Sequence, residues 1–125
     1  MDKEKVTFSR YGKSFQEQLC MVILDDRPFA DQIEEVLDVS FLELRYLKLF
    51  LKVIFQYRQK YGVHPSRSIL GTILRSGIDD ENEMTQQQVR EYYARAMSAR
   101  LENQEYIKDT ALDFCRKQNL KSAMI

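Results

Sequence analysis

This chain of 125 residues has few of the residues that mark several protein classes. It contains four glycines, two prolines, two cysteines, one histidine and no tryptophan. So little glycine and proline excludes collagen-like and low-complexity chains, and two cysteines are too few for a disulfide scaffold. No apolar run approaches the ~20 residues of a membrane span, and the N-terminus lacks the apolar stretch of a signal peptide. These absences predict a soluble, unexported, cytoplasmic protein with no membrane partner.

An excess of charge of one sign is also missing, because 19 Lys and Arg residues balance 19 Asp and Glu residues. A net charge of zero gives no global attraction to nucleic acid, so a polyanion would have to meet a local patch. The distribution is uneven, however: residues 17–43 hold eight acids and one base, and residues 44–78 hold seven bases and no acid. Either the two segments pair inside the fold, or the basic one meets a partner or nucleic acid.

The sequence holds no recognisable catalytic or cofactor motif. A phosphate-binding loop of the pattern Gly-x-x-x-x-Gly-Lys-Ser/Thr is absent, so the chain alone should hydrolyse no nucleotide. His64 follows Gly62 and precedes Pro65 in a turn between helices, which favours a capping or turn role over catalysis. Cys20 and Cys115 have no histidine at zinc-ligand spacing and fit apolar helix faces as buried thiols. We therefore expect no enzyme activity, no cofactor and no metal from this chain by itself.

Apolar spacing and helix-end residues predict six helices and no strand. In chain order the expected helices cover about 15–24, 28–37, 41–61, 66–77, 85–98 and 104–125. Capping boxes with Ser14, Ser40 and Thr85 are expected to start three of them, and Gly62 is expected to end the third in the left-handed conformation. The third helix is apolar nearly all round, so it should be the central helix that others pack against.

These elements predict one all-α domain, because a chain of this length can bury one core but not two. Residues 1–13 are expected to form a flexible N-terminal segment, and residues 14–78 a compact bundle of about four helices. Residues 84–125 are expected to form a C-terminal helical hairpin that leads to a linker. The last helix has no C-terminal cap, so either its final turns fray or the sequence is a fragment of something longer.

The expected hairpin carries apolar positions on more than one side, which one small body could not cover. These positions are either intramolecular core or a surface for self-association, as a dimer or a ring. The expected oligomer interface consists of Val89, Tyr92, Tyr93, Ala96, Tyr106, Ile107 and Phe114.

A second candidate surface is basic. Arg45, Lys48 and Lys52 recur along one face of the third helix, and Arg67 stands at the start of the fourth. The tight turn at 62–66 suggests a helix-turn-helix, but the helix after it offers only Arg67 and two serines for reading bases. A partner or nucleic-acid patch of these four residues supports an alternative function, a stand-alone DNA-binding regulator that uses the basic helices around 45–75.

Several segments together resemble the N-terminal domain of DnaB-type replicative DNA helicases. Residues 15–29, FQEQLCMVILDDRPF, are similar to the opening helix and acidic turn of that domain. Phe41, residues 47–57 and the turn 61–66, YGVHPS, are similar to its aromatic residue, long helix and Gly-x-Pro turn. Residues 103–108 and 114–118 are similar to its closing helix, which leads toward the linker and the ATPase. The resemblance covers about residues 14–125.

Two departures from the family pattern favour phage or mobile-element members over a housekeeping bacterial helicase. The usual Pro-Ile-Asp after the turn reads His64-Pro65-Ser66, and the His-Arg start of the long helix reads Leu44-Arg45. The resemblance implies a noncatalytic collar domain of a hexameric ring, in which helical hairpins pair neighbouring subunits and a surface contacts the primase or a helicase loader. It also implies that DNA is met only weakly or through a motor domain, and that the reading frame continues past Ile125 into a RecA-like ATPase.

Overall fold

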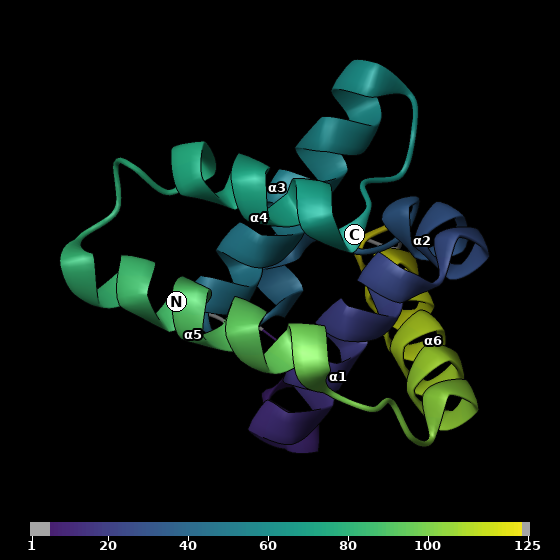
Figure 1. Ribbon diagram of the computed structural model, residues 1–125. Coiled ribbons are helices and arrows are strands. Elements are labelled where there is room, and N and C mark those ends of the chain that lie inside the picture. Colours follow the sequence, from purple (N-terminus) through teal and green to yellow (C-terminus); the bar gives the residue numbers. More distant parts are fainter. Residues whose placement is uncertain (1–5, 124–125) are drawn as a thin grey trace.

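The computed structural model describes residues 6–123, and every regular element in that range is a helix (Figure 1). The α-helices are α1 (Gly12–Asp25), α2 (Arg27–Glu34), α3 (Arg45–Tyr61), α4 (Arg67–Gly77), α5 (Glu83–Ser98) and α6 (Gln104–Ala123). Two short 3₁₀ helices, η1 (Phe8–Tyr11) and η2 (Val39–Phe41), precede α1 and α3. The predicted all-α class with six helices is confirmed over these residues. None of the described helices is long and apolar enough to cross a bilayer.

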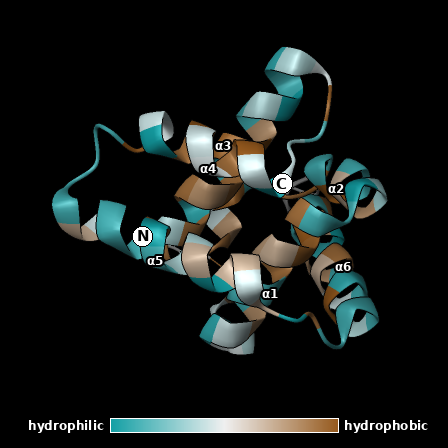
Figure 2. Ribbon diagram, in the orientation of Figure 1, coloured by the Kyte–Doolittle hydropathy of each residue, from teal (hydrophilic) through white to brown (hydrophobic). Residues whose placement is uncertain are grey.

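Helix α3 is the centre of the fold, as its apolar composition predicts. It packs against α1, α4, α5 and η2, and Leu47, Phe50, Leu51 and Ile54 on it are fully buried. In Figure 2 the brown, hydrophobic parts of the ribbon gather toward the middle of the molecule, and teal, hydrophilic parts lie mostly at its margins. Burial of each such side chain contributes about 1.5–3 kcal/mol, so the eight buried hydrophobic residues of α3 contribute substantially to the stability of the fold.

The N-terminal residues that the structure describes are folded, which differs from the expected flexible segment 1–13. The η1 turn buries Phe8 completely, with its ring centroid 4.5 Å from that of Phe114 and 5.9 Å from that of Phe15. Helix α1 then begins at Gly12. An apolar residue in the turn therefore ties residues 6–13 to α1 and α6. Residues 1–5 lie outside the described residues.

The expected C-terminal hairpin is not found, because α5 and α6 pack on different parts of the molecule. Helix α5 lies along α3, whereas α6 lies against α1 and α2. In Figure 1 the green α5 and the yellow α6 lie on different sides of the molecule and are joined by the loop 99–103. Each helix thus buries its apolar face against a different part of the fold.

The three predicted capping boxes are wrong. Ser14 lies inside α1, and Ser40 lies in η2, while α3 starts only after Leu44. Helix α5 is capped by Asn82, whose side-chain oxygen accepts a hydrogen bond from the Thr85 N–H at 2.8 Å. The helix therefore begins before Thr85, which occupies a position within its first turn.

Other helix ends agree with the sequence. Gly62 ends α3 in the left-handed conformation with φ 70°, and Ser66 caps α4 by accepting from the Ile69 N–H at 3.2 Å. Asp26 caps α2 in the same way, accepting from the Phe29 N–H at 3.0 Å. These caps satisfy orphan N–H groups and fix where the turns lie between α1, α2, α3 and α4.

Candidate functional site

Most of the expected self-association surface is buried inside the chain. Five of its seven members are at most 4% exposed: Val89, Tyr92, Ala96, Ile107 and Phe114. Tyr93 is half-buried and Tyr106 is 61% exposed. Because α5 and α6 each face the body rather than one another, their apolar stripes form core. Of the two interpretations that the sequence left open, core therefore describes these five residues, and they do not present a surface to a partner.

Tyr92 shows how completely this stripe is used within the fold. Its hydroxyl donates to the Glu17 carbonyl oxygen at 2.5 Å, and its ring centroid lies 4.9 Å from that of Phe50 and 5.7 Å from that of Tyr46. Burial raises the pKa of the Tyr92 hydroxyl, so it is a neutral donor at any ordinary pH. A desolvated tyrosine with a satisfied hydroxyl is a structural residue that joins α5 to α1 and α3.

Tyr106 is the member of the set that stays available. It lies in the first turn of α6, and its ring meets that of Phe15 edge-on with centroids 6.4 Å apart. Together with Tyr11 and Gln18 it lines a shallow hollow next to the loop that leads into α6. This hollow combines one exposed aromatic ring with polar neighbours, which is a composition that protein contacts favour.

Ion pairs divide the predicted basic patch. The guanidinium of Arg45 makes a two-pronged contact with the Glu81 carboxylate, with Nη2 2.8 Å from Oε2 and Nε 3.1 Å from Oε1. Lys48 and Lys52 follow it along α3, Lys52 is exposed, and neither forms an ion pair with residues 6–123. The positive charge on this face therefore comes mainly from the two lysines.

Arg67 is turned toward the rest of the fold. Its guanidinium pairs with the Asp25 carboxylate at the end of α1, which raises the pKa of Arg67, and its Nη1 donates to the Met97 carbonyl oxygen at 3.1 Å. Arg67 thus joins three helices, α1, α4 and α5, and its guanidinium group is engaged in these contacts. Two of the four predicted patch residues, Arg45 and Arg67, are thus paired with carboxylates.

The acidic and basic segments meet at the junction of α2, α3 and the turn after α3. Arg58 pairs with both Asp31 and Glu34, the latter at 3.1 Å. His64 Nε2 lies 2.6 Å from the Leu24 carbonyl oxygen, and its Nδ1 lies 2.7 Å from Arg58 Nη1. A carbonyl only accepts, so we infer that Nε2 carries the proton and that Nδ1 accepts from Arg58. Acidic and basic residues of the two segments thus pair with each other within the fold, and His64 links the turn to α1.

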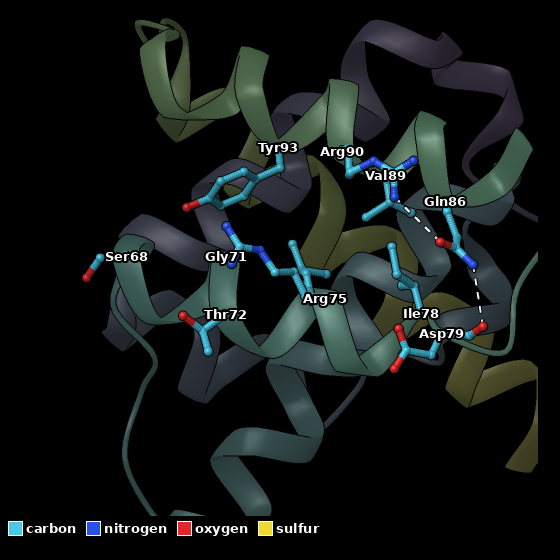
Figure 3. A pocket seen from close by; sticks show the side chains of 11 residues that line it. Ser68, Gly71, Thr72, Arg75, Ile78, Asp79, Gln86, Val89, Arg90 and Tyr93 are labelled. Atoms are coloured by element: carbon cyan, nitrogen blue, oxygen red, sulfur yellow. Dashed lines mark hydrogen bonds between the residues drawn. The ribbon is translucent and has the colours of Figure 1, made fainter. Parts of the chain in front are cut away.

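A cleft of about 520 Å³ lies between α4 and α5 (Figure 3). Polar side chains of α4 form one wall, namely Ser68, Thr72 and Arg75. Polar side chains of α5 form the other wall, namely Gln86, Arg90 and Tyr93. Leu74, Ile78 and Val89 form an aliphatic floor. The cleft is of the size that proteins use for ligands or for parts of a partner chain.

Tyr93 crosses from α5 to α4 at one end of this cleft. Its hydroxyl donates to the Arg67 carbonyl oxygen at 2.9 Å. This approach requires a glycine at position 71, because a Cβ built there would lie 2.7 Å from the Tyr93 hydroxyl oxygen. The pair Gly71 and Tyr93 therefore fixes the spacing of α4 and α5 and closes that end of the cleft.

The sequence analysis missed the two cleft arginines, Arg75 and Arg90. The available signal was a pair of polar stripes: positions 68, 72 and 75 share one face of α4, and positions 86, 90 and 93 share one face of α5. Spacings of four and three residues place side chains on the same face of a helix. The packing of the helices decides which faces lie opposite each other, and the two polar stripes alone do not predict that they face one cleft.

Both cysteines are buried and free, in agreement with the sequence. Burial raises the pKa of the Cys115 thiol to about 12 and that of Cys20 well above its usual range, so both are neutral thiols near pH 7. Among residues 6–123, no group of three His, Cys, Asp or Glu side chains is arranged to hold a metal ion.

Comparisons with protein-family models, with curated proteins and with solved structures find no match to this chain. The resemblance to the helicase N-terminal domain therefore stays a prediction, which rests on residues 15–29, 41, 47–57, 61–66 and 103–118. In the fold, these segments supply most of α1, the start of α2, most of α3 and most of α6.

Proposed function

We propose that this chain is a noncatalytic assembly and docking domain of the type found at the N-terminus of DnaB-type replicative helicases. The observation that carries the proposal is spatial: the segments with the resemblance are neighbours, because α1 packs against α2, α3 and α6. Segments that are far apart in the sequence, and that carry the resemblance, thus pack together in one domain.

In this role the domain pairs with neighbouring subunits of a ring and offers a separate surface to a primase or loader. Pairing would use side chains that the fold leaves exposed. On α6 these are Tyr106 and Leu120, at 61% and 62% exposure. Tyrosine is enriched among the residues that dominate the binding energy of protein contacts, so the outer face of α6 around Tyr106 replaces the buried hairpin stripe as our candidate for pairing.

Lys48 and Lys52 support a second candidate, the stand-alone DNA-binding regulator. Both lysines have no ion-pair partner within residues 6–123 and follow each other on α3. This candidate has less support, because Arg45 and Arg67, the other half of its patch, are engaged with Glu81 and Asp25. A DNA-binding surface of two lysines would neutralise few phosphates.

The first test is to read the frame that encodes this chain beyond Ile125 and to express its whole product. We expect a linker and a RecA-like ATPase, and a hexamer by native mass spectrometry. Tyr106→Ala should loosen that hexamer, whereas Tyr61→Ala, a control of similar exposure on α3, should leave it intact. A frame without an ATPase would overturn the helicase role.

DNA binding by the isolated chain separates the two candidates. A regulator that neutralises several phosphates loses affinity steeply as salt rises, whereas a docking domain shows weak binding at all salt concentrations. Tight binding to duplex DNA that Lys48→Ala and Lys52→Ala abolish would favour the regulator and contradict the docking domain.

A further inference from the structure

The α4–α5 cleft presents two arginines that the fold does not neutralise. Arg75 on α4 and Arg90 on α5 line its facing walls (Figure 3), and neither forms an ion pair within residues 6–123. The nearest acceptor of Arg90 is the Gln86 side-chain oxygen at 3.5 Å, which is a weak contact. Arg58 and Arg67, by contrast, each meet carboxylates of other helices. Each rim of the cleft therefore carries a positive charge that no carboxylate within residues 6–123 pairs with.

Between the two arginines the cleft is aliphatic. Leu74, Ile78 and Val89 are at most 4% exposed and form its floor, and the half-buried ring of Tyr93 closes one end. A group that settled between the rims would meet apolar atoms below and guanidinium groups beside it. This combination fits an apolar side chain flanked by carboxylates, as on one face of an amphipathic helix.

The surroundings of the cleft disfavour nucleic acid. Asp79 lines its other end, and Asp80 and Glu83 are exposed in the adjoining loop and helix start. A phosphate backbone that passed the two arginines would run into these carboxylates, and the whole chain has no net positive charge to compensate. A short peptide segment places its few carboxylates only where the arginines are.

We propose that the α4–α5 cleft is a docking site for an acidic amphipathic helix of a partner protein. Carboxylates of that helix pair with Arg75 and Arg90, and an apolar side chain between them lies over the small exposed edges of Leu74 and Ile78. The hydrogen bond between Tyr93 and Arg67 holds the two walls at a fixed spacing, so the site is formed before the partner arrives. This proposal rests on the docking function above, for which it names the surface and the partner chemistry.

The probe is a fluorescein-labelled peptide of about 18 residues, long enough for appreciable helix in water. Alanine fills most positions, leucine recurs at intervals of four and three residues, and glutamates flank only the central leucine on the same face. Matched peptides carry glutamine or lysine in place of every glutamate. Fluorescence anisotropy measures affinity, and the methyl NMR signals of Leu74, Ile78 and Val89 report whether the peptide occupies the cleft.

We expect the glutamate peptide to bind and to shift these methyl signals. Arg75→Glu and Arg90→Glu should each weaken binding about tenfold, as for reversal of one contact in a charged interface. Arg116→Glu on α6, an exposed arginine away from the cleft, is the matched control and should bind as the wild type does. The double variant Arg75→Glu/Arg90→Glu should instead prefer the lysine peptide, and a thermal melt checks that each variant is folded.

Several results would overturn the proposal. These are equal binding of the glutamine and glutamate peptides, equal weakening by Arg116→Glu, no saturable binding at millimolar peptide, or binding without methyl shifts. If the wild type binds duplex DNA in the cleft and the same two variants abolish that binding, the cleft is a nucleic-acid site instead. If the peptide binds but the reading frame encodes no ATPase, the docking site is supported and the helicase role is overturned. If the whole product is a hexameric ATPase that does not bind the peptide, the helicase role is supported and the docking site is overturned.

Discussion

Replacing Tyr92 by alanine tests whether the α5 stripe is core or an interface. Truncation of a buried aromatic side chain costs about 3–5 kcal/mol, and loss of the hydrogen bond to the Glu17 carbonyl adds about 1 kcal/mol. The sum is a large part of the ~5–15 kcal/mol that stabilises a domain. For a chain of this length, with roughly 3–5 °C per kcal/mol, Tyr92→Ala should lower the melting temperature on the order of 15 °C or prevent folding.

The assay is a thermal melt followed by circular dichroism, with light scattering on the same samples. Tyr92→Phe keeps the ring against Phe50 and loses only the hydroxyl, so it should cost about 1 kcal/mol. Tyr106→Ala removes an exposed ring and should leave the melting temperature nearly unchanged. If Tyr92→Ala melts like the wild type while the scattering mass falls, Tyr92 belongs to an interface and its burial here would be refuted.

Three further predictions concern single contacts. Gly71→Ala should cost less stability in a Tyr93→Phe background than in the wild type, because the added Cβ would lie 2.7 Å from the Tyr93 hydroxyl oxygen and 3.0 Å from the ring carbon that carries it; urea unfolding measures the difference. The hydrogen bond from Lys108 lowers the pKa of Asp26 below its unfolded value, so the stabilisation is present at neutral pH and is lost as pH falls below about 4. Asp26→Asn, which can still cap α2, should flatten that acid dependence in urea unfolding at several pH values. Cys115 should react with iodoacetamide only after unfolding, as mass spectrometry can follow.

Each of these predictions has a clear contrary result. Equal effects of Gly71→Ala with and without the Tyr93 hydroxyl would mean that the two groups do not meet. Identical acid profiles of wild type and Asp26→Asn would show that the contact with Lys108 does not stabilise the fold. Rapid alkylation of Cys115 in buffer would place it at the surface.

The helices themselves follow from the sequence, because apolar residues at spacings of three and four leave little choice of element. Helix starts do not follow so directly. Ser40 and Glu43 match a capping box, yet the Glu43 N–H donates to the Gln16 side-chain oxygen at 2.9 Å. Gln16 is fully buried on α1, so a contact across the fold decides where α3 can begin. A local pattern carries no information about that competing partner.

The failed hairpin has a similar cause. Neighbouring helices with a short loop often pack together, but α6 is held to the other side of the body by Phe114 against Phe8 and by Lys108, which lies 2.9 Å from Asp26. The charge pattern was more informative, because acids and bases in adjacent segments do pair, as Arg67 does with Asp25. The sequence showed which charges were unbalanced locally, and the packing decided which ones stayed free.

The contact between Phe8 and Phe114 also orders events during synthesis. The η1 turn leaves the ribosome well before α6, on the order of ten seconds earlier for elements that lie this far apart along the chain. Until α6 arrives, the rings of Phe8 and Phe41 lack Phe114, and the ring of Phe15 lacks Tyr106. The nascent chain therefore carries an open aromatic cluster until α6 emerges, and these rings are covered only when α6 docks on α1.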